Sequence, residues 1–131
     1  MPHLRFEYSK GLQELADLDA LAATLRTALV DTGHCPLGGI RVRGFRADHQ
    51  TIADGGGGYH FLDMVLRLGA GRDDATRAEI ADKLYAAAEA ALRGQLGDLA
   101  FILSLEVVEI NNRFSRKSWS TIHAAIKERS A

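Results

Sequence analysis

Proline in position 2 is the residue whose chemistry depends most on its place in the chain. A small second residue such as proline favours removal of the initiator methionine, which leaves the secondary amine of Pro2 at the amino terminus. Burial and nearby cations both disfavour a charged amine, so they lower its pKa from about 8. Such an amine would exchange protons near neutral pH, where acid–base catalysis is most effective. The alternative is that Pro2 is a terminal residue without a chemical role.

Three arginines stand where they could bind anions. Arg41 and Arg43 are two residues apart in an expected strand, so both project from the same side. Together they could hold a dianionic substrate through its carboxylates; a solvated strand edge is the alternative. Arg72 ends the segment 69–72, between an expected strand and an expected helix, where free backbone amides favour anions. A tight turn with a helix cap at Asp73 is the alternative there.

The other reactive side chains do not form a second site by their spacing. The five histidines are scattered without a pair at metal-ligand spacing, so no metal site is expected. Cys35 is the only cysteine, which excludes an internal disulfide and fits a reducing compartment. We expect its thiol to be a small buried hydrophobic group. The basic run at residues 115–119 is interpreted as a solvated segment of the tail.

The composition is that of a globular domain and excludes several classes of partner. Hydrophobic residues make up 47% and charged residues 25% of 131 residues. Because 16 basic residues balance 17 acidic ones, no nucleic-acid-binding face is expected. No apolar stretch approaches the roughly 20 residues needed to cross a bilayer, and the amino terminus lacks a signal-peptide pattern. We therefore expect a soluble, cytoplasmic protein without a membrane partner.

Hydrophobic periodicity predicts two successive strand–helix–strand units and a tail. Alternation with a period of two marks strands, and apolar residues three or four apart mark helices. The expected strands span residues 3–8, 39–46, 59–68 and 99–110, the helices 12–31 and 73–92, the glycine-rich loop 48–58, and the tail 111–131. The tail is expected to pack on the body of the domain or on a neighbouring subunit.

This order of elements predicts an α+β fold in one domain, residues 1–131. Two β-α-β units, 2–47 and 59–110, would form parallel pairs with right-handed crossovers. The resulting four-stranded mixed sheet would carry both helices on one face, so its uncovered apolar face predicts an oligomer. By parity, Pro2 shares a face with Leu4 and Phe6. A ferredoxin-like split unit contains the same elements and stays open as an alternative.

Taken together, these residues resemble the 5-carboxymethyl-2-hydroxymuconate isomerases. This is a branch of the tautomerase superfamily, related to 4-oxalocrotonate tautomerase and macrophage migration inhibitory factor. The likeness covers most of the chain, and the order and spacing of its pieces make it specific. The pieces are residues 1–3, 16–18, 32–33, 36–43, 53–55, 68–72 and 103–106.

The resemblance implies a homotrimer whose sheets form a central core, with no metal and no organic cofactor. It implies that Pro2 acts as base and then as acid. The implied substrate is an unsaturated hydroxy di- or tricarboxylate from bacterial breakdown of 4-hydroxyphenylacetate through homoprotocatechuate. Arg41, Arg43 and Arg72 match arginines of the family's motifs. They would anchor carboxylates and stabilise charge on the dienolate oxygen, and the resemblance assigns no separate roles.

Two other functions stay open at this stage. One is a different amino-terminal-proline reaction of the superfamily, the hydration or dehalogenation of an unsaturated acid, which needs a protonated amine. The other is a trimeric binding protein of the same fold without enzymatic activity. Retention of Met1 would favour the second, because the nitrogen of Pro2 would then be an amide.

Overall fold

Alternating side chains build the sheet. In the computed structural model, which describes residues 1–130, Leu4 and Phe6 are buried on one face of β1 (His3–Tyr8). Arg5 and Glu7 are exposed on the other face. The described elements in chain order are β1 (His3–Tyr8), η1 (Leu12–Glu14), α1 (Leu18–Asp31), η2 (Leu37–Gly39), β2 (Arg41–Arg46), β3 (His60–Gly69), α2 (Asp74–Leu96), β4 (Phe101–Ile110) and α3 (Ile122–Ser130).

The strands form one mixed sheet in the order β2-β1-β3-β4. Strands β1 and β2 run parallel, β3 and β4 run parallel, and the two pairs meet where β1 lies antiparallel to β3. The predicted four-stranded mixed sheet is confirmed. The ferredoxin-like alternative is wrong, because a split unit needs a strand inserted within each β-α-β unit and none is inserted among the described strands.

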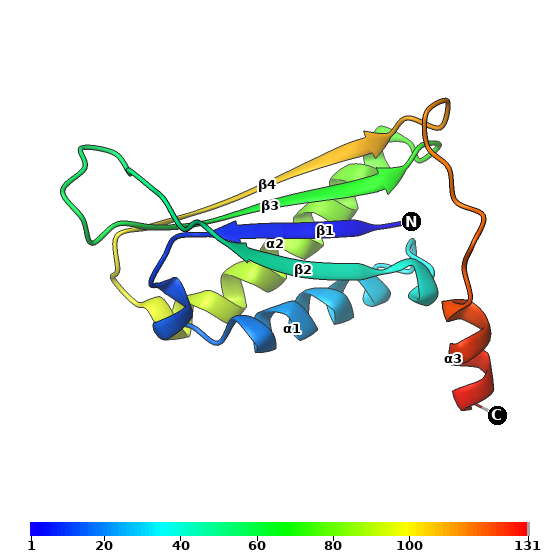
Figure 1. Cartoon of the computed structure of the whole chain (residues 1–131), viewed down its shortest axis with the longest axis horizontal. Helices are drawn as coiled ribbons and strands as arrows, with labels where there is room; N and C mark the ends of the chain where they lie inside the picture. Colours follow the sequence, from blue (N-terminus) through cyan, green and yellow to red (C-terminus); the bar gives the residue numbers. More distant parts are fainter. Residues whose placement is uncertain (131) are drawn as a thin grey trace.

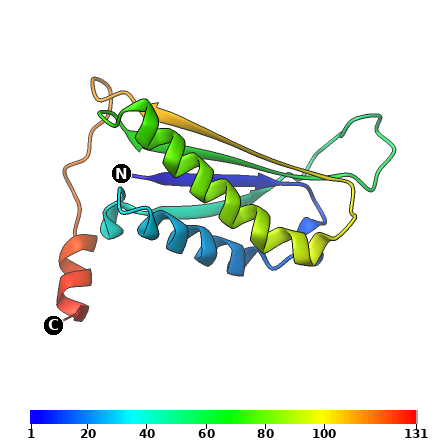
Figure 2. The ribbon, with the colours of Figure 1, turned by 180° about the vertical axis from the view of Figure 1, so that it is seen from behind.

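Both long helices cover the same face of the sheet, as predicted (Figure 1; Figure 2). They contact each other and present leucines, an isoleucine and an alanine to the strands. The buried helix residues are Leu21, Leu25 and Leu29 of α1 and Ile80, Leu84, Ala88 and Leu92 of α2. No described element covers the other face (Figure 1), and Ile102 on β4 is 64% exposed. No helix within residues 1–130 has the length and apolar character that membrane crossing requires.

The first helix begins later than its periodicity predicts, and the tail holds a helix that was not predicted. Residues 12–14 form a 3-10 turn, and α1 starts only after Asp17, whose carboxylate accepts a hydrogen bond from the Ala20 amide at 3.0 Å. The tail forms α3, which packs against η2. None of the residues of α3 is fully buried, so the helix needs no apolar face. The hydrophobic periodicity used to predict helices was therefore weak here.

The ring of Phe6 lies against Gly44, its register partner on β2. A Cβ at Gly44 would come within 2.3 Å of that ring, which is itself only 2% exposed. We predict that Gly44→Ala lowers the free energy of unfolding by about 1–3 kcal/mol through overpacking. Chemical denaturation measures this change.

The matched control for this prediction is Gly94→Ala. A Cβ at Gly94 on α2 meets no atom within 4 Å, and the alanine should raise stability by up to about 1 kcal/mol, as in other exposed helix interiors. Equal stability of Gly44→Ala and the wild type would contradict the packing described.

Candidate active site

A cavity of about 520 Å³ lies at the end of the sheet where β1 begins. Each strand contributes a residue to its wall: His3 from β1, Arg41 from β2, and Arg67 with Gly69 from β3, joined by Ile110 from β4. The segment 112–117 of the tail closes another side, and the chain passes close to the amino terminus there (Figure 1). Among the described residues that line this cavity, none is acidic.

The strand register gathers three of these side chains in one row. His3 is paired with Arg41 on the parallel side and with Arg67 on the antiparallel side. Directly opposed residues of neighbouring strands stand on the same face of a sheet, about 5 Å apart. Because Leu4 is buried beneath the helices, this row projects from the uncovered face. The result is a cationic row next to the amino terminus.

The amino-terminal amine faces this cavity in an environment that disfavours its charge. Burial lowers the pKa of the Met1 amine, the cations of Lys117 and Arg72 lower it further, and the opposing effect of Cys35 outweighs the weaker effect of Arg41. With Met1 attached, the nitrogen of Pro2 is part of a peptide bond. The ring of Pro2 is buried, and its Cδ would lie 3.4 Å from a Cβ placed at Gly39.

His3 shares this environment. Burial first, and then Arg67, Arg41 and Arg43, lower the pKa of its imidazole. Its Nδ1 is buried without a hydrogen-bond partner among the described residues. The low pKa favours the neutral ring at physiological pH, so His3 adds a polar group to the cavity and little positive charge.

The structure brings two of the three predicted arginines to the amino terminus. Arg41 lines the cavity, and its Nη1 donates a hydrogen bond to the carbonyl of Gly39 at 3.0 Å. Arg72 does not line the cavity, because its guanidinium donates to the carbonyls of Gly69 at 3.1 Å and His34 at 2.8 Å. Its charge still acts on the amine.

Arg43 lies on the same face as Arg41, as the strand spacing predicts, but one step further along β2. Its register partner is Arg5, and it does not line the cavity. Its charge is among those that lower the pKa of His3. The substrate-binding role predicted for Arg43 therefore lacks the direct access to the cavity that Arg41 has.

The sequence prediction missed three cations. Arg67 projects from a strand whose alternate residues are buried, and only the register with His3 shows where it points. Arg116 and Lys117 are exposed, as expected for a solvated tail. They also line the cavity, so the interpretation of this run as merely solvated was incomplete. The basic character of Arg116 and Lys117 was visible in the sequence. The path of the tail, which brings them to the cavity, was not.

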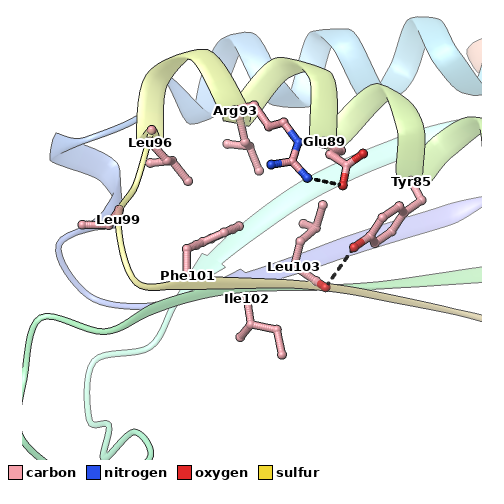
Figure 3. Close-up of a pocket in the computed structure, with 10 residues that line it drawn as sticks. Tyr85, Glu89, Arg93, Leu96, Leu99, Phe101, Ile102 and Leu103 are labelled. Atoms are coloured by element: carbon pink, nitrogen blue, oxygen red, sulfur yellow. Dashed lines mark hydrogen bonds and ion pairs between the residues drawn. The ribbon is translucent and has the colours of Figure 1, made fainter.

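A second cavity, of about 340 Å³, lies between α2 and the start of β4 (Figure 3). Its charged and polar groups pair with one another: Arg93 contacts Glu89 at 3.1 Å, and the hydroxyl of Tyr85 donates to the carbonyl of Leu103 at 3.4 Å. Glu89 and Arg93, the two charged residues among its described lining, thus pair with each other. We therefore assign the candidate site to the cavity at the amino terminus. Residues 1–130 contain no cluster of three or more histidine, cysteine or acidic side chains suited to a metal ion.

The fold is that of the tautomerases. One similar solved structure is a fused 4-OT symmetric trimer, 18% identical, with a TM-score of 0.67 over 90% of this chain and 95% of that chain. Another, a 5-carboxymethyl-2-hydroxymuconate isomerase from Deinococcus radiodurans, is 29% identical with a TM-score of 0.86. That likeness covers 95% of this chain and 93% of the other.

The sequence defines the family within this fold. The curated 5-carboxymethyl-2-hydroxymuconate Delta-isomerase of Escherichia coli is 32% identical over 127 residues, 97% of this chain and all of that protein. The pattern of the 5-carboxymethyl-2-hydroxymuconate isomerase family matches residues 2–126. The chain belongs to this family. The resemblance found in the sequence is thereby confirmed.

Arg72 holds two loops together beside the amino terminus. We predict that Arg72→Met lowers the free energy of unfolding by about 1–3 kcal/mol, because two backbone carbonyls lose a charged donor. Arg93→Met is the control: its side chain is 76% exposed in a helical i,i+4 pair, and such pairs contribute about 0.5 kcal/mol or less. Urea denaturation of both variants measures the difference, and equal effects would refute the anchoring role of Arg72.

Proposed function

We propose that this protein is an isomerase that converts 5-carboxymethyl-2-hydroxymuconate, a conjugated hydroxy tricarboxylate, to its keto isomer. The observation that carries the proposal is the cavity at the amino terminus, lined by His3, Arg41, Arg67 and Lys117 and, among the described residues, by no carboxylate. Cations without neighbouring anions favour a polyanionic substrate. Membership of the isomerase family supports the same reaction.

The proton carrier in this proposal is the secondary amine of Pro2 after removal of Met1. The amine takes the proton of the enol hydroxyl, and the electrons of that O–H bond form the ketone. The conjugated double bonds shift, and the protonated amine returns a proton to a distant carbon. No atom is gained or lost overall. The reaction therefore calls for no cofactor, and the amine must begin each cycle neutral.

The environment of the amino terminus supports this starting state. Burial and the cations of Lys117, Arg72 and Arg41 lower the pKa of the Met1 amine, and we expect the same groups to act on the amine of Pro2 once Met1 is removed. A lowered pKa means that the neutral, proton-accepting form is present at a lower pH than for a free amino terminus. Hydration and dehalogenation need a protonated amine instead, so the same environment disfavours those two alternatives.

The arginines take different parts in the proposed reaction. Arg41 reaches the cavity and would bind a carboxylate or the developing dienolate oxygen. Arg72 would act on the amine through its charge while its hydrogen bonds hold the surrounding loops. Arg43 lies beyond the cavity wall and would add to the positive potential that attracts the substrate.

The assembly in this proposal is a homotrimer in the cytoplasm, within homoprotocatechuate degradation. No element within residues 1–130 covers the sheet face opposite α1 and α2 (Figure 1), which supports association through that face. The fused 4-OT structure of the same fold is a symmetric trimer. No observation specifically favours the alternative function, a trimeric binding protein without enzymatic activity.

Ultraviolet monitoring of 5-carboxymethyl-2-hydroxymuconate ketonisation by the purified protein tests the proposal. We predict turnover by the wild type and a lower kcat/KM for Pro2→Ala. The loss should be smaller than the about 10²- to 10⁴-fold contributed by a positioned acid–base group, because alanine keeps a primary amine. Circular dichroism provides the control that the variant is folded. Full activity of Pro2→Ala, or an inert wild type, would overturn the proposal.

A further inference from the structure

The last part of the chain crosses the end of the sheet at which the amino terminus lies (Figure 1; Figure 2). We call residues 111–130 the C-terminal strap. It leaves β4, passes the cavity through residues 112–117, and ends in α3, which packs against η2. The strap therefore has two contacts with the domain, one at the cavity and one at the 37–39 turn.

The second contact depends on a residue without a side chain. A Cβ at Gly38 would lie 2.3 Å from Nδ1 and 2.6 Å from Cε1 of His123, so the imidazole fills space that only glycine leaves open. Gly38 is buried and does not have a left-handed backbone. Space, and not backbone conformation, requires glycine at this position.

The neighbouring glycine faces the amino terminus. A Cβ at Gly39 would lie 3.4 Å from Cδ of Pro2, and the carbonyl of Gly39 accepts the hydrogen bond of Arg41 at 3.0 Å. One turn therefore contacts the strap through Gly38 and the candidate active site through Gly39. Movement of α3 on this turn would change the position of the strap relative to the cavity.

The strap brings Lys117 to the cavity. Lys117 lines the same cavity as Met1, and its positive charge lowers the pKa of the amino-terminal amine. It forms no ion pair with any carboxylate of residues 1–130. Arg116 beside it donates instead to the carbonyls of Arg113 and Ser115, each at 3.1 Å. Of the two strap cations that line the cavity, Lys117 is thus the one that makes no hydrogen bond within the described residues.

We propose that Lys117 binds a carboxylate of the substrate from the C-terminal strap, and that the contact between Gly38 and His123 positions it. The inference rests on the proposed isomerase function, whose substrate carries the carboxylates. An ammonium supplied by a segment outside the sheet, in the same cavity as Arg41 and Arg67 of the strands, would add a contact to the anion from a second element.

Binding of muconate, a conjugated dicarboxylate without the reacting enol, tests Lys117 without turnover. Fluorescence of Trp119, the single tryptophan of the chain, follows the titration because it lies two residues from Lys117 on the strap. We expect Lys117→Met to raise the Kd about 10- to 100-fold, as for loss of a charged hydrogen bond. Lys127→Met, the same change on an exposed part of α3, should leave the Kd unchanged.

Kinetics with 5-carboxymethyl-2-hydroxymuconate should show the same pattern, with the loss mainly in KM. Equal muconate affinity of Lys117→Met and the wild type, or a wild type that does not bind muconate, would overturn the inference about Lys117. A wild type that binds muconate but does not isomerise the substrate would overturn the proposed function alone. The two failures are therefore distinguishable.

The pKa of the Pro2 amine tests whether the contact between Gly38 and His123 positions Lys117. In protein that begins at Pro2, ¹⁵N-proline labelling gives one amine signal, because Pro36, the other proline, is in a peptide bond. Lys117→Met should raise the pKa of that amine, since a nearby cation is lost while Arg72, Arg41 and Cys35 remain. Gly38→Ala should raise it similarly by displacing His123, and Gly94→Ala should not.

A double-mutant comparison separates displacement of the strap from general damage. Lys117→Met should add little to the rise in pKa already caused by Gly38→Ala. Gly38→Ala should likewise add little once His123→Ala has removed the ring. Additive effects in both pairs, or an unchanged amine pKa in a folded Gly38→Ala protein, would overturn the positioning role of this contact.

Discussion

The rest of this structure depends on one constraint: positive charges are held together around the amino terminus, and no described residue of the cavity wall carries a carboxylate. Arg41 and Arg67 flank His3 in one row of the sheet, and Lys117 approaches from the tail. Like charges at such distances repel, so the fold must hold them in place. The same repulsion lowers the pKa of the amine and favours a bound anion. Proton transfer and substrate binding thus follow from one arrangement of charge.

The architecture keeps this arrangement on rigid supports. Both long helices bury their leucines against one face of the sheet (Figure 1; Figure 2), so the row of His3, Arg41 and Arg67 projects from the opposite face. Hydrogen bonds fix β1 between β2 and β3, and this pairing sets the cationic row. The guanidinium of Arg72 ties the end of β3 to the loop at His34. Backbone pairing and core packing therefore balance a repulsion that no ion pair among residues 1–130 relieves.

The local sequence pattern predicted most helices and strands, but it did not predict the tertiary contacts between them. The alternation in β1 and the helical spacing in α2 predicted the strand and the helix because each pattern reports burial on one face. The start of α1 depended on the cap at Asp17, and α3 depended on His123 meeting Gly38. Pro2 and Arg41 were identified by position and spacing. Arg67 and Lys117 were missed, because only strand register and the path of the tail bring them to the cavity.

The most direct test compares two forms of the same protein, one beginning at Pro2 and one with Met1 attached. Mass spectrometry verifies each amino terminus, and ketonisation of 5-carboxymethyl-2-hydroxymuconate is then measured under identical conditions. The account predicts activity in the form with a free proline and loss of nearly all of it when Met1 converts that nitrogen to an amide. Equal rates for the two forms would contradict it.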